Sequence, residues 1–399
     1  MTRASLRLPV LALLPLLALA LTACGGTQPV AVGPTSLPDA PTLAPTTAPT
    51  LAPTAPPTSE PTLVPATAPT VAPTAVPDLA TRIDTYLKRL VDQGRFSGVV
   101  LAAKGGEQLF AQGYGLADRE RETPNTPQTR FQIASLTKQF TAMAILMLQA
   151  NGKLSVDDKL CAHIEPCPEA WAEVTIHHLL THTAGMPDSF IDEEGPVAPE
   201  DVIASFRDKP LKFTPGDHWE YSNTGYMLLG AIIERVSGQS YGDFLQERIF
   251  TPLGMADTGY NRPDEGACGY FGKGLAKPAN LTVAFSAGGL SSTVEDLYRW
   301  EQALDTDTLI PAELRELMFT PHVDLNVLST PESYGYGWII DSFEGKLRQE
   351  HGGSIPGYLS ELMRFPEQGV TIILLSNTED LGYTHLAVEP IARWVLAEP

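Results

Sequence analysis

Apolar residues recur with a helical or strand period only beyond residue 78. Around residues 84–91 they return every three to four positions, which predicts an amphipathic helix. The run 96–103 is apolar and β-branched and predicts a strand, and residues 107–113 predict its pairing partner. The folded part of the chain is therefore expected to open with a helix and a hairpin.

The middle of the chain has the pattern of helices and its end has the pattern of strands. Residues 136–150 are almost continuously apolar and end at Gly152, which predicts a buried helix with a glycine cap, and 226–236 predicts a second one. Four late strands and a closing helix are predicted at residues 335–340, 346–350, 360–365, 370–375 and 385–396. Strands at both ends with helices between them predict an α+β sheet domain that carries an all-α insertion.

The first residues have the layout of an export signal. Two arginines precede an apolar run over residues 8–21, which contains two prolines and is shorter than the roughly 20 residues of a spanning helix. Residues 1–23 are therefore predicted to be a signal peptide. The residues just before Cys24 resemble the lipobox of bacterial lipoproteins, so Cys24 is predicted to carry a lipid on the extracytoplasmic face of the cell membrane. Ordinary secretion with a chance cysteine is the alternative.

Residues 24–78 are predicted to be a disordered tether. Sixteen of the 35 prolines lie before residue 79, Ala-Pro-Thr recurs, and large apolar side chains are few. Such a segment cannot bury enough surface to offset the entropy cost of ordering, and proline favours an extended polyproline II conformation. The tether would hold the folded domain of residues 79–399 away from a membrane. A ligand strip for proline-binding modules is the alternative.

Charge excludes some classes of partner. The chain has a formal charge of −20, and about 19 of these charges lie after residue 78. A domain that is so acidic repels nucleic acid phosphates and anionic lipid headgroups, so nucleic acid is not an expected partner.

The cysteines agree with an exported domain. Cys161 and Cys167 lie six residues apart, which in an oxidising compartment favours a local disulfide. Zinc binding by these two cysteines with His163, or free thiols, are the alternatives. Cys268 is expected to be unpaired.

Ser135 and Lys138 open the most apolar predicted helix. Three residues apart, they lie on one face, and the serine meets the positive end of the helix dipole. A lysine among apolar neighbours can lose its proton and act as a base toward a serine hydroxyl. A capping serine with an exposed lysine is the alternative.

Two further motifs carry polar groups that could act on a substrate. Tyr221 lies two residues before Asn223, just ahead of a predicted helix; a tyrosine near a lysine ammonium can have a lowered pKa, and the amide can donate to a substrate carbonyl. His351 is followed by two glycines and Ser354 at the end of a predicted strand, where a ligand can approach the backbone. The alternatives are a packed tyrosine and a tight turn.

A metal site is not expected from the remaining histidines. His178 and His182 are four residues apart, but no glutamate completes a His-Glu-x-x-His pattern.

Together these motifs resemble those of the serine β-lactamase and penicillin-binding superfamily, in its branch of class C β-lactamases, D,D-peptidases and esterases. Ser135 with Lys138 resembles Ser-x-x-Lys, Tyr221 with Asn223 resembles Tyr-x-Asn, and His351 with Gly353 resembles the Lys/His-x-Gly strand motif. Residues 131–134, 152–158, 179–185 and 288–293 match as well. The resemblance covers roughly residues 80–398. It implies a sheet part at about 79–130 and 286–399 and a helical part at about 131–285.

The resemblance also implies a mechanism without a metal or other cofactor. Ser135 would form an acyl-enzyme, and Lys138 and Tyr221 would move the protons. The backbone N–H groups of Ser135 and Ser354 would form the oxyanion hole. Asn223, His351, Gly353 and Ser354 would bind the substrate, and Tyr221 would be the base of deacylation.

The third motif departs from that of β-lactamases, which usually reads Lys-Thr-Gly or Lys-Ser-Gly. Here His351 is largely neutral near pH 7 and Gly352 has no hydroxyl, so weaker recognition of a substrate carboxylate is expected. The resemblance therefore favours a D,D-carboxypeptidase-like or D-aminopeptidase-like peptidase, or an esterase. A penicillin-binding or sensing protein that acylates without efficient turnover, or a weak β-lactamase, is the alternative.

Overall fold

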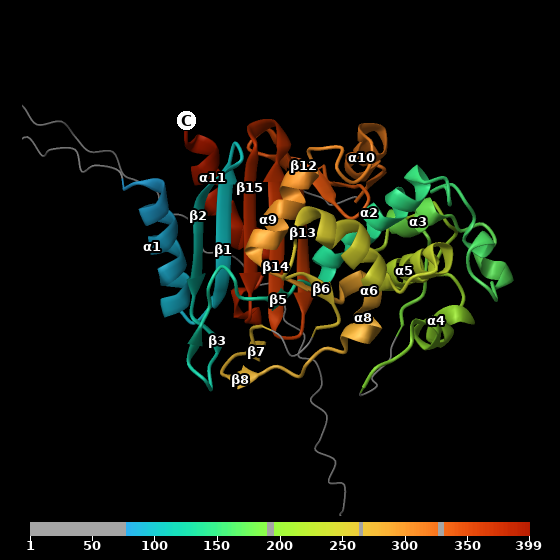
Figure 1. Cartoon of the computed structure of the whole chain (residues 1–399), viewed down its shortest axis with the longest axis horizontal. Helices are drawn as coiled ribbons and strands as arrows, with labels where there is room; N and C mark the ends of the chain where they lie inside the picture. The colour runs from blue at the N-terminus through green and yellow to red at the C-terminus, as the bar shows by residue number, and fades with distance from the viewer. Residues whose placement is uncertain (1–76, 190–194, 263–265, 326–330) are drawn as a thin grey trace, which may run out of the picture. The chain divides into compact units, whose positions relative to one another are not determined.

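The computed structural model describes residues 77–189, 195–262, 266–325 and 331–399 (Figure 1). The predicted signal peptide, Cys24 and nearly all of the predicted tether lie outside these residues. Among the helices that are described, none is both long and apolar enough to cross a membrane.

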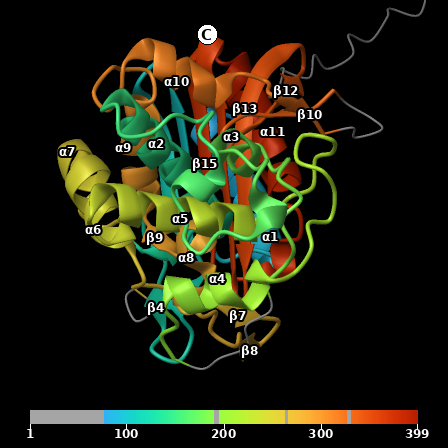
Figure 2. The ribbon, with the colours of Figure 1, turned by 90° about the vertical axis from the view of Figure 1, so that its right-hand side faces the viewer.

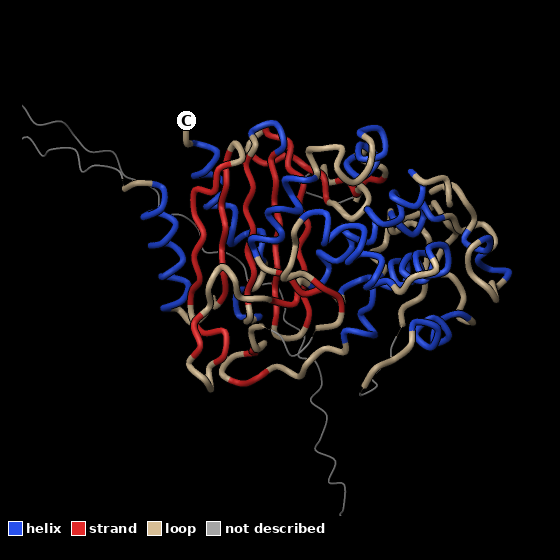
Figure 3. Tube along the Cα trace, in the orientation of Figure 1, coloured by secondary structure: helices blue, strands red, loops and turns tan. Residues whose placement is uncertain are grey.

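The centre of the structure is an antiparallel sheet of eight strands, drawn in red in Figure 3. Its spatial order is β10-β11-β12-β13-β14-β15-β1-β2, so the first hairpin joins the late strands through the pair β1 and β15. The strands are β1 Gly98–Lys104, β2 Glu107–Tyr114, β10 Val323–Asp324, β11 Ser333–Tyr334, β12 Ile339–Phe343, β13 Lys346–Ile355, β14 Tyr358–Phe365 and β15 Val370–Ser376.

The central strands are buried on both faces because each face is covered by helices. Val100 and Ala102 of β1 pack in a core with residues of α1 (Leu79–Asp92) and α11 (Thr384–Ala397). Val99 and Leu101 point to the opposite face and join the larger core, which includes α2 (Thr137–Ala150). The α+β architecture predicted from the order of the elements is confirmed.

The helical part lies on the α2 side of the sheet. In Figure 2 α3, α4, α5 and α6 stand in front of the strands. The helices that follow α2 along the chain are α3 Ile176–Leu180, α4 Pro199–Arg207, α5 Asn223–Ser237, α6 Tyr241–Leu245, α7 Thr251–Leu253, α8 Leu281–Gly288, α9 Val294–Ala303 and α10 Ala312–Phe319.

The insertion is not purely helical, in contrast to the expectation. Short strands pair within it or at its borders, and strands of two or three residues are too short to leave a periodic pattern in the sequence. They are β3 Leu116–Asp118, β4 Thr123–Pro124, β5 Phe131–Gln132, β6 Gly259–Tyr260, β7 Tyr270–Phe271, β8 Gly274–Leu275 and β9 Leu290–Ser292.

The strand predicted over residues 335–340 is wrong in its placement. The chain turns at residues 335–338, between β11 and β12, and the backbone N–H of Gly335 donates to the carbonyl of Trp338 at 2.8 Å. Gly337 has φ +81°, a conformation that favours glycine. The residues of this turn are apolar and aromatic, so their sequence resembles that of a buried strand. They are buried for another reason, which is that the turn packs against α2.

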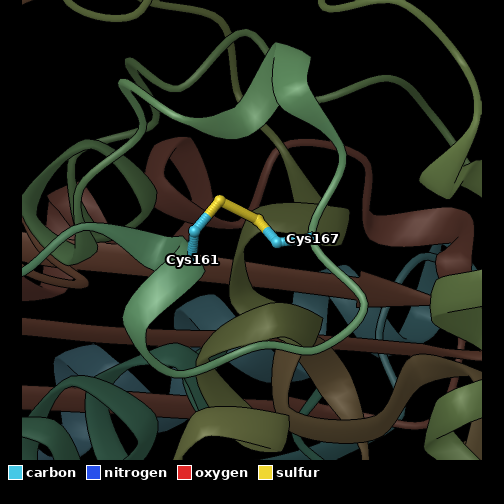
Figure 4. The surroundings of a disulfide bond; sticks show 2 residues. All are labelled: Cys161 and Cys167. Atoms are coloured by element: carbon cyan, nitrogen blue, oxygen red, sulfur yellow. A yellow bond between two sulfur atoms is a disulfide. The ribbon is translucent and has the colours of Figure 1, made fainter.

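Cys161 and Cys167 are joined by a disulfide in the structure (Figure 4), the pairing that the sequence favoured. The zinc alternative fails because both sulfurs are bonded to each other, and the Nε2 of His163 instead lies 2.9 Å from a carboxylate oxygen of Asp158. Within the described residues no group of three metal-ligating side chains occurs. Cys268 is a free thiol, as expected.

Candidate active site

Ser135 lies in the single 3₁₀ turn Ala134–Leu136 that leads directly into α2. Its neighbour Ala134 has φ +46°, a left-handed conformation that is strained for a residue with a side chain. The turn is held by burial of Ile133 and Leu136, which are 0 % exposed. The sequence predicted a serine at a helix start, and the structure adds the strained turn that presents it.

Lys138 is fully buried one turn after Ser135. Its Nζ lies 3.2 Å from Ser135 Oγ, 2.8 Å from Asn223 Oδ1 and 2.8 Å from the carbonyl oxygen of Ala287. The Ala287 carbonyl is available because α8 ends at Gly288, and the last carbonyls of a helix have no partner within it. The predicted pair is thus brought together, and two elements far away in the sequence complete its surroundings.

Burial lowers the pKa of Lys138 well below its usual range. A neutral amine has two N–H bonds and one lone pair. Two of its three neighbours, the Asn223 amide oxygen and the Ala287 carbonyl, can only accept hydrogen bonds. They take both N–H bonds, so the lone pair is left for the hydroxyl of Ser135. This arrangement can remove a proton from Ser135 without any rearrangement.

Tyr221 lies beside this pair, with Lys138 Nζ 4.7 Å from the centre of its ring. The expectation of a lowered pKa is wrong: burial raises the pKa of Tyr221 above its usual range, and only a hydrogen bond with Ser135 acts in the opposite direction. Burial is the largest cause, and Lys138 is not among the groups that stabilise a phenolate at this position. Tyr221 is therefore a neutral hydroxyl that can pass a proton on.

Asn223 is the first residue of α5, and its exposed side chain gives its oxygen to Lys138. The amide NH₂ is the part that can still donate to a substrate. Ser222 caps the helix by accepting from the N–H of Gly225 at 3.2 Å. The cap explains why the two polar residues of the second motif lie on either side of a helix start.

The third motif lies inside a strand and not in a tight turn, since β13 continues through His351 to Ile355. Gly353 faces the nucleophile turn: a Cβ placed there would lie 2.3 Å from Ser360 Oγ, 2.5 Å from the Ile133 oxygen and 3.0 Å from the Ser135 nitrogen. Only glycine permits so close an approach of the strand to Ser135. Ser354, next along the strand, lines the neighbouring cavity.

His351 is buried on the same face of β13. Burial, and then repulsion from the positive charge that Lys138 carries when its amine is protonated, lower the pKa of His351 to about 4. Its Nε2 lies 3.0 Å from the hydroxyl of Tyr334, and its Nδ1 lies 2.6 Å from the carbonyl oxygen of Gly352. Both ring nitrogens therefore already have protein partners.

His178 and His182 do not form a metal site. The Nδ1 of His178 accepts from the backbone N–H of Thr175 at 3.2 Å in a helix cap, whereas His182 lies under the catalytic-motif tyrosine with its ring 4.4 Å from that of Tyr221. His182 belongs to residues 179–185, one of the stretches that match the superfamily. Its φ of +60° marks it as a strained position, and no sequence pattern indicates that.

Sequence reasoning missed Ala287 and Tyr334 as members of the site. Ala287 contributes only a backbone oxygen, so its side chain gives no signal. Tyr334 lies in a run with other aromatic residues, which predicts core packing. Neither could be found without the tertiary contacts.

A cavity of about 510 Å³ lies beside this cluster at the edge of β13. One wall is formed by Tyr221, Tyr334, His351 and Gly353, and the cavity continues past Gly352 to Glu350 and Glu361 on the other face of the strand. Tyr221, Gly353 and Ser354 thus border a space that is large enough for a small substrate.

The sequence matches the family described as Beta-lactamase over residues 83–388. The chain belongs to the β-lactamase family. The match spans both the sheet and the helical part, and so includes all three motifs. The superfamily that the sequence resembles is thereby confirmed.

Several known proteins resemble this β-lactamase-family chain in sequence and in fold. It is 35 % identical over 343 residues to penicillin-binding protein 4* of Bacillus subtilis, covering 79 % of this chain and 75 % of that protein. It resembles the structure of an octameric penicillin-binding protein homologue from Pyrococcus abyssi, with 31 % identity, a TM-score of 0.71 and coverage of 78 % and 76 %. It also resembles a D-amino acid amidase from Ochrobactrum anthropi, with 25 % identity, a TM-score of 0.72 and coverage of 80 % and 99 %.

These similarities make the chain a serine hydrolase of the β-lactamase and penicillin-binding type.

Proposed function

We propose that this chain hydrolyses D-amino-acid peptides, amides or small esters through an acyl-enzyme on Ser135, as a D,D-carboxypeptidase-like or D-aminopeptidase-like peptidase or an esterase. The observation that carries the proposal is the environment of Lys138. Its amine is buried and its pKa is lowered well below the usual range. Its Nζ lies 2.8 Å from each of two oxygens that can only accept hydrogen bonds and 3.2 Å from Ser135 Oγ, so that a neutral amine would have its lone pair left for the serine.

The proposed reaction has two halves. In the first, Ser135 Oγ attacks the carbonyl carbon and its proton passes to Lys138, while the N–H groups of Ser135 and Ser354 stabilise the negative oxygen. The bond to the leaving group then breaks, and the departing nitrogen or oxygen takes a proton through Tyr221. In the second half, water attacks the acyl ester, loses a proton along the same path and releases the acid. Because the pKa of Tyr221 is raised, this residue relays protons and does not store a negative charge.

The choice of substrate class rests on two observations. A relative with full coverage of its length is a D-amino acid amidase. The β13 motif offers a neutral histidine where β-lactamases offer a lysine, which disfavours efficient binding of a β-lactam carboxylate. Together they favour D-amino-acid substrates and esters over β-lactams.

A panel of substrates tests the proposal on the purified domain of residues 77–399. It contains D-alanyl-D-alanine, D-amino-acid amides, p-nitrophenyl esters of short acids and a chromogenic cephalosporin, with the S135A variant as blank. We expect turnover of at least one of the first three classes and slower turnover of the cephalosporin. Hydrolysis of none of the first three would contradict the proposed function.

The alternative of a penicillin-binding protein without turnover is kept because relatives carry that name. Mass spectrometry of the intact protein after incubation with benzylpenicillin distinguishes the two. A hydrolase loses the added mass within minutes to hours at a measurable rate, whereas a binding or sensing protein keeps it and turns over no member of the panel.

We further propose that the enzyme is a lipoprotein on the extracytoplasmic face of the cell membrane. Support comes from the apolar run before Cys24 and from the proline-rich tether after it. In a bacterial host the Cys24→Ala variant is expected to move from the membrane fraction to the soluble fraction, because a lipidated thiol would be lost. Equal membrane association of both forms would disprove the anchor, and Cys268→Ala is the matched control.

A further inference from the structure

A continuous chain of hydrogen bonds runs from the helical part to the strand edge at the site. The backbone N–H of Ser222 donates to His182 Nδ1 at 3.1 Å. His182 Nε2 lies 3.1 Å from the hydroxyl oxygen of Tyr334, and this hydroxyl lies 3.0 Å from His351 Nε2. The chain ends at the carbonyl oxygen of Gly352, 2.6 Å from His351 Nδ1.

The two ends of this chain determine where every proton lies. A backbone N–H can only donate, so His182 Nδ1 has no proton. Burial lowers the pKa of His182 well below its usual range, so the ring is neutral and its single proton lies on Nε2, which donates to Tyr334. Burial raises the pKa of Tyr334, so its hydroxyl keeps its proton and donates it to His351 Nε2.

The Gly352 end of the chain independently gives the same direction for these hydrogen bonds. The carbonyl of Gly352 can only accept, so His351 carries its proton on Nδ1 and leaves Nε2 as the acceptor for Tyr334. All four hydrogen bonds are satisfied in one direction with both imidazoles neutral. The opposite direction would leave two donors facing each other at Ser222 and His182.

We propose that His182 and Tyr334 are positioning residues that hold His351 as a neutral imidazole with no N–H for the substrate, and that the site therefore selects acyl donors whose leaving group carries no carboxylate. The inference rests on the proposed function and narrows the range of substrates. D-amino-acid amides, D-peptide amides and esters are favoured, and peptides with a free carboxylate next to the scissile bond are disfavoured.

The lining of the cavity agrees with this selection. A carboxylate that leaves water needs a cation or several donors in exchange. The described residues that line the cavity include Glu350 and Glu361 but no lysine or arginine. Lys138, the amine beside the nucleophile, is buried with a lowered pKa, and its Nζ is engaged by Asn223 Oδ1 and the Ala287 carbonyl oxygen. A substrate carboxylate would find neither a lysine nor an arginine there, and His351 and His385 are the lining side chains that can carry a positive charge.

A pair of substrates that differ only in the leaving group tests the proposal. These are N-acetyl-D-alanyl-D-alanine and its C-terminal amide, which present a carboxylate and a carboxamide at the same position. For the wild type we expect kcat/KM for the amide to exceed that for the acid at least tenfold, mainly through KM. A ratio near one, or a preference for the acid, would overturn the proposal.

The Tyr334→Phe variant tests the role of the hydrogen-bond chain. It removes only the hydroxyl that donates to His351 Nε2. This nitrogen can then take up a second proton while Nδ1 keeps the one that it donates to Gly352, and the resulting imidazolium would attract a carboxylate, so the amide-to-acid ratio is expected to fall at least fivefold. Tyr336→Phe is the matched control: Tyr336 is equally buried, its hydroxyl contacts His177 at 2.8 Å, and it does not line the cavity. This control should keep the wild-type ratio. An unchanged ratio in Tyr334→Phe would contradict the assignment.

A second readout does not depend on hydrolysis. NMR of the protein labelled with ¹⁵N-histidine shows which ring nitrogen is protonated. We expect the proton on Nε2 of His182 and on Nδ1 of His351, and a change at His351 in Tyr334→Phe alone. Calorimetric titration of both peptides into the S135A variant measures the same preference as binding. If no peptide is hydrolysed but the preference and the tautomers are found, the proposed function fails and the selection stands; the opposite tautomers would refute the inference.

Discussion

The Ser135→Ala variant is expected to lose at least about 10⁴-fold in kcat/KM on every substrate that the wild type turns over. The loss is large because Ser135 supplies the atom that forms the acyl-enzyme, and no neighbouring group can replace it. The turn that carries the serine stays intact, since it is held by burial of Ile133 and Leu136 and not by the hydroxyl. Steady-state rates, with circular dichroism to confirm folding, measure the effect.

A serine outside the site provides the matched control. Ser237 is the last residue of α5, at the opposite end of this helix from Asn223, and its side chain contacts only Gln239 among the hydrogen bonds described. Ser237→Ala should change kcat/KM by less than about twofold, as surface substitutions usually do. Retained activity in Ser135→Ala would show that the nucleophile is another residue.

Lys138→Met is expected to lower kcat about 10³-fold, the range that a well-placed general base contributes. Methionine is similar in length and apolar, so it fills the buried space but cannot accept the proton of Ser135. The loss should appear in kcat, because Lys138 contacts Ser135 and not the cavity wall. Single-turnover formation of the acyl-enzyme measures this loss.

Lys159→Met, which removes an exposed amine that pairs with Glu173, is the control and should leave kcat nearly unchanged. An active Lys138→Met enzyme would mean that another group takes the proton.

The same variant changes how stability depends on pH. In the wild type the pKa of Lys138 is lowered on folding, so the unfolded chain binds more protons than the folded one. Stability therefore rises with pH between this lowered pKa and the usual lysine value near 10.5, by up to roughly 1.4 kcal/mol per pH unit. Lys138→Met lacks this contribution. Urea unfolding at pH 6 and pH 9 should show a smaller difference between the two pH values for the variant, and equal differences would contradict a neutral Lys138.

Much of the fold follows from local pattern. The helix before β1 has a helical period, whereas α2 and the last strands are apolar runs that their lengths and the residues flanking them assign to a helix or a strand. The turn between β11 and β12 was misplaced because its aromatic residues are apolar for tertiary reasons, through packing against α2. The two-residue strands could not be predicted, since pairing partners distant in the chain create them.

The residues of the site were likewise found from local motifs, whereas their protonation depends on tertiary packing. Ser135 and Lys138 were found because they belong to a single helix start, and Asn223, Gly353 and Ser354 because short motifs surround them. The direction of the pKa of Tyr221 was wrong because burial is the largest cause of the shift. Burial depends on α2, α5 and α8 packing together.

The sequence by itself determined which residues carry polar chemistry, and that an acidic α+β domain follows a proline-rich segment. These features depend on residue type and on spacing along one element. Only the tertiary structure decided that Ala287 completes the environment of Lys138 and that His182 reaches His351 through Tyr334. Hydrogen bonds form between atoms about 3 Å apart. Two of these bonds join residues 149 and 152 positions apart, and the third joins residues on different strands, so no pattern within one element predicts them.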